Sequence, residues 1–268
     1  MKWYRFLDSQ GEICYGRDLV ADNSVHLLQG DPFDSLEDSG QRVAIKKLLA
    51  PVEPRAILCI GLNYRQHVGE FGGQVPERPV LFMKNPAAVC HPGDPILLPA
   101  SCFNPPQVDY ETELAVVIGR AARNVSKAEA LDYVLGYTIG NDVSARRWQK
   151  EGGGGQWVRG KSFDTFCPLG PALVTADGIP DPQKLHLTCT VNGQTVQDDS
   201  TAAMIFPVAE LIAYLSEDTT LLPGTVIMTG TPSGVGFART PPLFLAPGDT
   251  VSMTIEPIGT LTNPVVGT

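Results

Sequence analysis

The amino-acid sequence predicts a β-rich fold of many short strands and a few short helices. The chain has 268 residues, including 27 glycines and 23 prolines, and these fall between short apolar runs. Because glycine and proline interrupt regular structure, their number favours short strands over long helices. Hydrophobic residues make up 43% of the chain and charged residues 18%, as in an ordinary globular protein.

The chain is expected to divide into a small N-terminal subdomain, residues 1–50, and a larger domain, residues 55–268. The first 50 residues begin with a strand-like stretch and continue through an acidic segment interrupted by glycine and proline. The two prolines in residues 51–54 then predict a stiff linker, because each proline fixes its own φ and restricts the residue before it.

The strands are predicted from short apolar runs bounded by turn residues. Residues 185–191 alternate between apolar and polar side chains and lead to Asn192 and Gly193, the strongest hairpin signal in the chain. The predicted strands lie at residues 3–6, 56–61, 79–84, 114–119, 133–140, 185–191, 223–228 and 247–253.

Three short helices are predicted from their start signals. The S-x-x-E spacing that begins at Ser126 is typical of a capping box. Residues 141–149 are expected to turn into a helix with Asp142 or Ser144 as its N-cap. Residues 207–215 begin with proline and continue with apolar side chains three or four positions apart.

Composition excludes several classes of protein. The net charge is −9 and the pI about 4.9, so the chain lacks the basic surface that binds nucleic acid or an anionic membrane. The sequence has no apolar run near the roughly 18 residues of a membrane span, and its N-terminus turns polar too early for a signal peptide. The six cysteines are scattered and predict free thiols. We expect a cytoplasmic protein.

Residues 108–119 carry acids at every second position, followed by an apolar run. In a strand, alternate side chains share one face, so Asp109, Glu111 and Glu113 would lie side by side. Gathering like charges beside an apolar segment is unfavourable unless a shared proton or a cation neutralises them. A bound divalent metal is the natural candidate, and a solvated strand end is the alternative.

His67 and Glu70 stand three positions apart, which lets their side chains touch in a helical turn. The apolar and glycine-rich residues 71–73 follow them. One interpretation is a movable lid with a His–Glu pair, in which the carboxylate orients the imidazole and raises its basicity. The alternative is a capped surface turn with an incidental histidine.

Further polar residues follow in the chain. If residues 141–149 form one helix, Asp142, Arg146 and Gln149 share a face, either at a site or as a cap with an intrahelical ion pair. After a loop with four consecutive glycines, Lys161 is either a carboxylate anchor or a solvated charge.

The Gly/Thr-rich residues 229–236 could form a backbone nest for an anion. They are not a Walker loop, because the required GK[ST] is missing.

Together these segments resemble the fumarylacetoacetate hydrolase family. The match follows the family's order over roughly residues 55–240, and five motifs in one order are far more specific than any single one. The matching segments are residues 63–70 (NYRQHVGE), 109–113 (DYETE), 140–146 (GNDVSAR), 160–166 (GKSFDTF) and 229–236 (TGTPSGVG).

The resemblance implies an α+β fold dominated by a rolled mixed β-sheet, with residues 55–268 as the catalytic domain, and a homodimer. It implies that Glu111, Glu113 and Asp142 hold Mg²⁺ or Mn²⁺, which agrees with the preference of these ions for hard oxygen ligands. Asp109 is then expected to have a supporting or structural role. The family's other site residues correspond to His67 and Glu70 as the acid–base pair, to Lys161, and to Arg146, Gln149 and Thr231 as substrate-binding residues.

The predicted activity is hydrolysis of a C–C bond in a small acylpyruvate-like 2,4-dioxo acid. A metal that binds two substrate oxygens stabilises the enolate formed when the bond breaks. The same site could serve a decarboxylase, or an isomerase or tautomerase, of a related 2-oxo acid such as an oxaloacetate-like or 2-hydroxy-dienedioate-like compound. A catalytically silent binder on the same fold is a further alternative.

Overall fold

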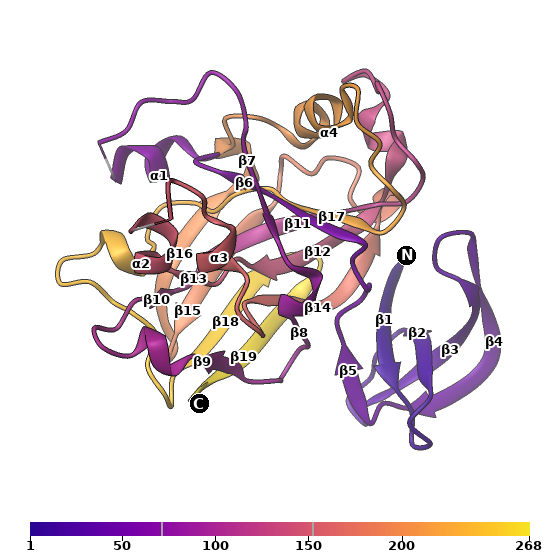
Figure 1. Ribbon diagram of the computed structural model, residues 1–268. Coiled ribbons are helices and arrows are strands. Elements are labelled where there is room, and N and C mark those ends of the chain that lie inside the picture. Colours follow the sequence, from indigo (N-terminus) through magenta and orange to yellow (C-terminus); the bar gives the residue numbers. More distant parts are fainter. Residues whose placement is uncertain (71, 152) are drawn as a thin grey trace.

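A computed structural model describes residues 1–70, 72–151 and 153–268 of the chain (Figure 1). The N-terminal strands form consecutive antiparallel hairpins, and the short β5 pairs with β1. They lie together at one side of the molecule in Figure 1, around a small core that includes Phe6 and Val25. These strands are β1 (Lys2–Leu7), β2 (Ile13–Arg17), β3 (Ser24–Asp31), β4 (Ser35–Ala44) and β5 (Lys47–Leu49).

The N-terminal strands continue into a large mixed sheet, because β1 also pairs with β14 through Lys2 and Trp3. In this sheet β11 lies between β12 and β17 and is buried at every position, as expected for its apolar run. β17 and β6 are parallel, whereas β6 and β7 are antiparallel. The remaining strands of the sheet are, in spatial order, β14 (Cys167–Thr175), β12 (Val134–Asn141), β11 (Thr112–Ile118), β17 (Thr225–Met228), β6 (Ala56–Gly61) and β7 (Val80–Lys84), with β8 (Val89–Cys90) alongside β14.

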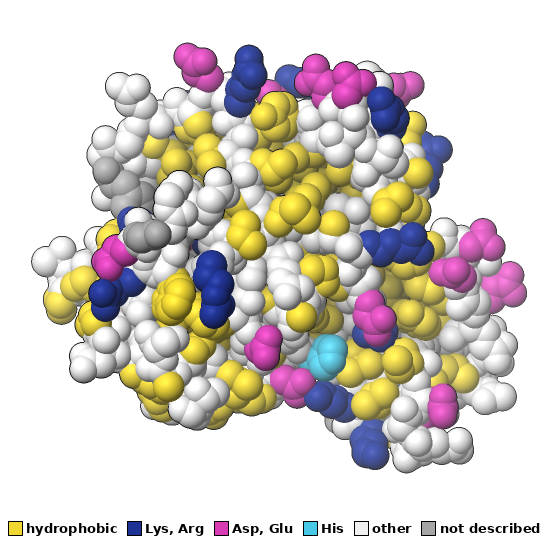
Figure 2. Space-filling model, viewed as in Figure 1, with side chains coloured by type: hydrophobic (Ala, Val, Ile, Leu, Met, Phe, Trp, Pro, Cys, Tyr) yellow, Lys and Arg dark blue, Asp and Glu magenta, His cyan; other side chains and the backbone are white. Residues whose placement is uncertain are grey.

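The strand β7 lies at the end of this order and exposes Leu81 and Met83. Figure 2 shows hydrophobic side chains gathered over the region where Figure 1 places β6 and β7.

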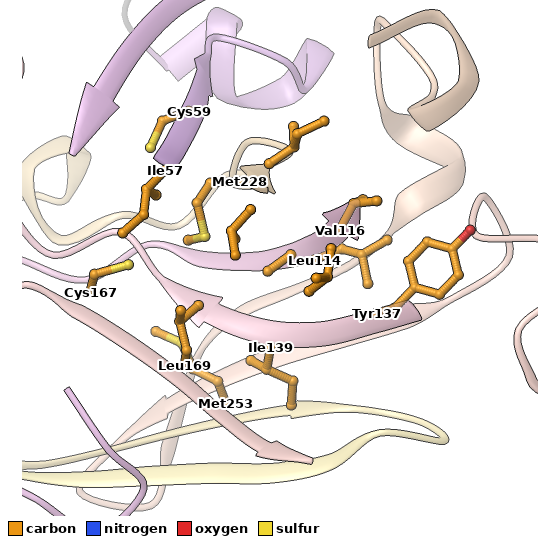
Figure 3. Close-up of a cluster of buried hydrophobic side chains, with 14 of the residues drawn as sticks. Ile57, Cys59, Leu114, Val116, Tyr137, Ile139, Cys167, Leu169, Met228 and Met253 are labelled. Carbon is orange, nitrogen blue, oxygen red and sulfur yellow. The ribbon is translucent and has the colours of Figure 1, made fainter. Parts of the chain in front are cut away.

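A second sheet packs against the first and closes the core. Figure 3 shows Met253 from this sheet beside Ile139 and Leu169 of the large sheet. The hairpin predicted at Asn192 and Gly193 is confirmed, and both residues have positive φ as a two-residue turn requires. The strands are β16 (Gln194–Ser200), β15 (His186–Val191), β18 (Thr250–Ile255), β19 (Gly259–Gly267) and β9 (Ile96–Leu98), and a separate pair is formed by β10 (Val108–Asp109) and β13 (Ser144–Ala145).

The helices are short, as predicted, and lie around the sheets (Figure 1). The helix that begins after Pro207 is confirmed. The segment at Ser126 instead forms a turn, in which the hydroxyl bonds the Glu129 carboxylate at 2.6 Å, before a 3₁₀ turn. The α-helices are α1 (Arg65–Glu70), α2 (Arg146–Lys150), α3 (Val158–Lys161) and α4 (Val208–Ser216). The 3₁₀ turns are η1 (Pro86–Ala88), η2 (Ala100–Cys102), η3 (Ala130–Tyr133), η4 (Ala176–Gly178), η5 (Thr201–Ala203) and η6 (Gly236–Ala238).

The predicted start of α2 is wrong. The helix begins at Arg146, and its N-cap residue Ala145 has no side-chain capping bond. Asp142 cannot cap it because its carboxylate is buried and bound by lysine ammonium groups, and Ser144 lies in β13.

All six cysteines are free, as predicted, and five of them are buried. Among the described residues, no helix is long and apolar enough to span a membrane.

Candidate active site

A cavity of about 220 Å³ is lined by α1, α2, α3 and the ends of several central strands. Its lining combines three kinds of side chain. The carboxylates are Glu111, Glu113 and Asp142, and the cationic or polar residues are His67, Arg146, Gln149, Lys150, Lys161 and Thr231. The apolar residues include Ile60, Leu62, Val68, Phe82 and Trp157.

The three carboxylates of this cavity lie close together and away from water. Each offers an oxygen within 4.8 Å of the oxygens of the other two. The exposed fractions of Glu111, Glu113 and Asp142 are 5%, 2% and 0%. The alternative of a solvated strand end is therefore wrong. Such a cluster of hard oxygen donors can hold a divalent cation.

Antiparallel pairing of β11 with β12 brings these carboxylates together. Thr112 pairs with Asn141 and Glu113 with Gly140, so the start of β11 lies beside the end of β12. Asp142 directly follows β12, and its backbone N–H donates to the Glu111 carbonyl at 2.9 Å. Residues separated in sequence thus meet at one end of the sheet.

The expectation that Asp109 shares a face with the two glutamates is wrong. The strand is interrupted between β10 and β11, and this break turns Asp109 away from the cavity. Its carboxylate instead accepts backbone N–H groups from Gly236 at 2.7 Å and Phe237 at 2.9 Å. Arg146 Nε also donates to it, at 2.8 Å. Asp109 therefore has a supporting position.

Two buried lysines bind the carboxylate cluster. Lys161 Nζ lies 2.7 Å from Glu111 Oε2 and 2.6 Å from Asp142 Oδ2. Lys84 Nζ, on β7, lies 2.6 Å from the other oxygen of Asp142 and donates to the Val143 carbonyl at 3.1 Å. Lys161 is not the solvated charge of the alternative interpretation, because only 2% of it is exposed.

The cations divide the cluster into two electrostatic environments. Burial alone would raise the pKa of Glu111, but Lys161 and Arg146 outweigh it and hold that pKa below its usual value. Glu113 receives less compensation, so burial and the neighbouring Asp142 and Glu111 raise its pKa well above the usual range. A further cation at Glu113 would relieve this repulsion.

Arg146 and Gln149 lie together on the wall of the cavity. Arg146 Nη1 is 2.7 Å from Glu111 Oε1 and donates to Gln149 Oε1 at 3.1 Å. Asp142, Arg146 and Gln149 all line the cavity. The prediction that they share one helix face is wrong for Asp142, which lies before the helix and reaches the cavity from the strand end.

Residues 229–236 bind anions through their backbone, and these anions belong to the chain itself. Gly230 N–H donates to Glu113 Oε2 at 2.8 Å, and Gly234 N–H to Glu70 Oε1 at 2.7 Å. Gly236 donates to Asp109. The turn therefore holds three carboxylates in fixed positions.

His67 and Glu70 form the expected pair on α1. His67 Nδ1 lies 2.9 Å from Glu70 Oε2, and His67 is 6% exposed and lines the cavity. The alternative of a surface turn with an incidental histidine is therefore wrong. Of the predicted lid loops, residue 71 and Gly152 lie outside the described residues.

Some residues of the site give little or no signal in the sequence. Gln197 on β16 donates to Thr231 Oγ1 at 2.8 Å and accepts the Thr112 N–H at 3.0 Å, so it fixes Thr231 at the cavity. Lys84 gives only a weak signal, as a lysine at the end of an apolar strand. Lys150 stands four residues after Arg146, a spacing that puts both on one helix face.

Comparison with known proteins identifies the family of the larger region. A model described as "Fumarylacetoacetate (FAA) hydrolase C-terminal" matches residues 56–266, and one described as "Rv2993c-like, N-terminal" matches residues 1–51. A mitochondrial oxaloacetate tautomerase of Xenopus laevis is 48% identical over 233 residues, covering 85% of this chain and 72% of the relative. A human mitochondrial oxaloacetate tautomerase is 47% identical over 219 residues, covering 81% and 69%.

Solved structures agree over the whole chain. The 5-carboxymethyl-2-hydroxymuconate delta-isomerase of Mycobacterium smegmatis matches with a TM-score of 0.86 and 40% identity, covering 100% of both chains. The 2-hydroxyhepta-2,4-diene-1,7-dioate isomerase of Mycobacterium marinum matches with a TM-score of 0.84 and 41% identity, covering 100% of this chain and 98% of that one. The predicted β-rich fold of this type is confirmed.

Replacement of Lys84 by methionine should destabilise the protein, because it removes one of the two ammonium partners of the buried Asp142. Breaking a buried ion pair usually costs about 3–5 kcal/mol. Since Lys161 remains, we expect a loss of about 2–3 kcal/mol in the free energy of unfolding, measured by urea denaturation. Lys184→Met, which breaks a pair with an 80% exposed lysine side chain, is the control and should change little. Equal stability of both variants would contradict this role of Lys84.

Proposed function

The chain belongs to the fumarylacetoacetate hydrolase family, and we propose that it is a divalent-metal-dependent tautomerase or isomerase of a 2-oxo acid. The observation that carries this proposal is the buried carboxylate cluster in one cavity with the His67–Glu70 pair. The names of the relatives favour this reaction over the C–C bond hydrolysis expected first from the sequence.

We assign Glu111, Glu113 and Asp142 as the residues that would hold Mg²⁺ or Mn²⁺. The donor set fits, because all three offer carboxylate oxygens within 4.8 Å of one another. The raised pKa of Glu113, caused by burial beside Asp142 and Glu111, indicates a deficit of positive charge at this point. When bound, the ion would polarise the substrate's carbonyl oxygen and favour the enolate.

The role of His67 in this reaction is proton transfer. Glu70 accepts a hydrogen bond from Nδ1, which orients the ring and leaves Nε2 as the nitrogen that exchanges a proton with the substrate. Gly234 N–H fixes the other oxygen of Glu70. In the keto-to-enol direction one proton leaves the carbon beside the carbonyl group and one is delivered to oxygen. Water is not consumed, and the carbon skeleton stays intact.

Four other cavity residues are proposed to orient the substrate. Arg146 and Lys161 supply positive charge beside the carboxylate cluster, although both also donate to Glu111. Gln149 and Thr231 supply polar atoms at the same cavity. We assign these four residues to the carboxylate and carbonyl oxygens of the substrate.

Hydrolysis of an acylpyruvate is the second candidate function. The buried His67–Glu70 pair also suits this reaction, because an oriented imidazole can activate a water molecule. The products distinguish the two reactions, since hydrolysis releases pyruvate and tautomerisation releases nothing.

The activity is tested by offering the purified protein, with Mg²⁺ or Mn²⁺, enol-oxaloacetate, a dienoic 2-hydroxy acid and acylpyruvates. We expect faster loss of the enol or dienol absorbance, with the carbon skeleton unchanged by mass spectrometry. Pyruvate release from acylpyruvates without tautomerisation would favour hydrolysis instead. Release of CO₂ as the main product would indicate a decarboxylase.

His67→Ala should reduce the rate of tautomerisation at least about 100-fold, because general acid–base catalysis contributes about 10²–10⁴. Metal affinity, measured by calorimetry, should remain because His67 is not among the proposed ligands. His186→Ala is the control, since the His186 side chain is 64% exposed and pairs with Asp198. Full activity of the His67 variant would refute the assignment.

A further inference from the structure

Lys150 occupies a distinctive position on the cavity wall. It is the last residue of α2 and lines the cavity together with Arg146 and Lys161. Those two residues are buried, whereas Lys150 is exposed, so it marks the side of the cavity that opens to solvent. Its Nζ lies 3.8 Å from the centre of the Phe237 ring. This cation–π contact helps to position the ammonium.

The position of Lys150 sets a spacing within the cavity. Arg146 and Lys150 are four residues apart, so their backbones lie about one helical turn, or about 5.4 Å, apart on the same side of α2. Arg146 is in contact with Glu111 at 2.7 Å. A ligand with one end at the carboxylate cluster can therefore extend a second group along this wall of the cavity toward Lys150.

The charges around the cavity suit an anionic ligand. Three carboxylates face three permanent cations, namely Arg146, Lys150 and Lys161. The adjacent Asp109 and Lys84 add one charge of each sign. Glu70, bonded to His67 at the cavity, adds a further negative charge. A divalent ion at the carboxylates would then leave an excess of positive charge, which an anionic ligand would balance.

The environment of Lys150 also favours an anion. Although Lys150 is exposed, partial burial, followed by the charge of nearby Arg146, lowers its pKa. A carboxylate beside it would stabilise the charged form. The apolar side chains that line the cavity, such as Phe82 and Trp157, suit the carbon chain between the two ends of such a ligand.

We propose that Lys150 binds the distal carboxylate of a dianionic 2-oxo acid and selects dicarboxylates over monocarboxylates. This inference rests on the proposed function and deepens it by naming the residue that determines the substrate class. Lys150 is a specificity residue and takes no part in proton transfer.

The test compares enol-oxaloacetate with the enol of its 4-methyl ester, which keeps the skeleton and lacks the distal charge. Lys150→Met should raise KM for oxaloacetate about tenfold and leave kcat within about twofold, because it removes binding common to the ground and transition states. KM for the ester should stay within about twofold. Lys150→Arg should retain most of the discrimination between the two substrates. The control Lys184→Met, at an exposed lysine, should change KM for neither substrate.

Equal effects of Lys150→Met on both substrates, or no effect on either, would overturn the proposal. If the wild-type protein converts neither these two compounds nor the dienoic 2-hydroxy acid, the proposed function fails. The role of Lys150 is then tested separately by ligand binding. In calorimetry with Mg²⁺, 2-oxoglutarate should bind more tightly than its 5-methyl ester, and Lys150→Met should abolish that preference. An unchanged preference in the variant would contradict the role of Lys150.

Discussion

The burial of several carboxylates at the end of the β11–β12 pair is the constraint on which the rest of the site depends. The register of these strands places Asp142 beside Glu111 and Glu113, and unpaired charges in such a place are strongly unfavourable. The surrounding elements supply cations that neutralise these carboxylates. β7 supplies Lys84, α3 supplies Lys161 and α2 supplies Arg146, all within hydrogen-bond distance of a carboxylate of the cluster. The helices around the cavity thereby acquire fixed positions.

The turn at residues 229–236 links this cluster to the acid–base pair. Its backbone binds Glu113 through Gly230 and Glu70 through Gly234, so one rigid segment positions a proposed metal ligand and the partner of His67. Peptide N–H groups stabilise carboxylates without adding a mobile charge. The proton-transfer group and the proposed metal ligands therefore keep a defined relation, which enolate chemistry requires.

Features that depend on local signals could be predicted from the sequence. Contacts between residues far apart in the chain could not. The hairpin at Asn192 and the helix after Pro207 follow from turn and capping chemistry, and the pairing of His67 with Glu70 follows from helical spacing. Lys84 and Gln197 could not be predicted, because their partners lie far away in the sequence and only the sheet register brings them together. The position of Asp142 was misjudged for the same reason, since its burial overrides its preference for a helix N-cap.

Diffraction from crystals soaked in Mn²⁺, recorded near the manganese absorption edge, tests the central claim most directly. We predict one strong anomalous peak in the cavity, bonded at about 2.1 Å to carboxylate oxygens of Glu111, Glu113 and Asp142. Crystals of the Glu113→Gln variant soaked in the same way should show a much weaker peak, since an amide replaces a charged ligand. An empty cavity in the wild-type crystals, or an ion bound by other residues, would contradict the account.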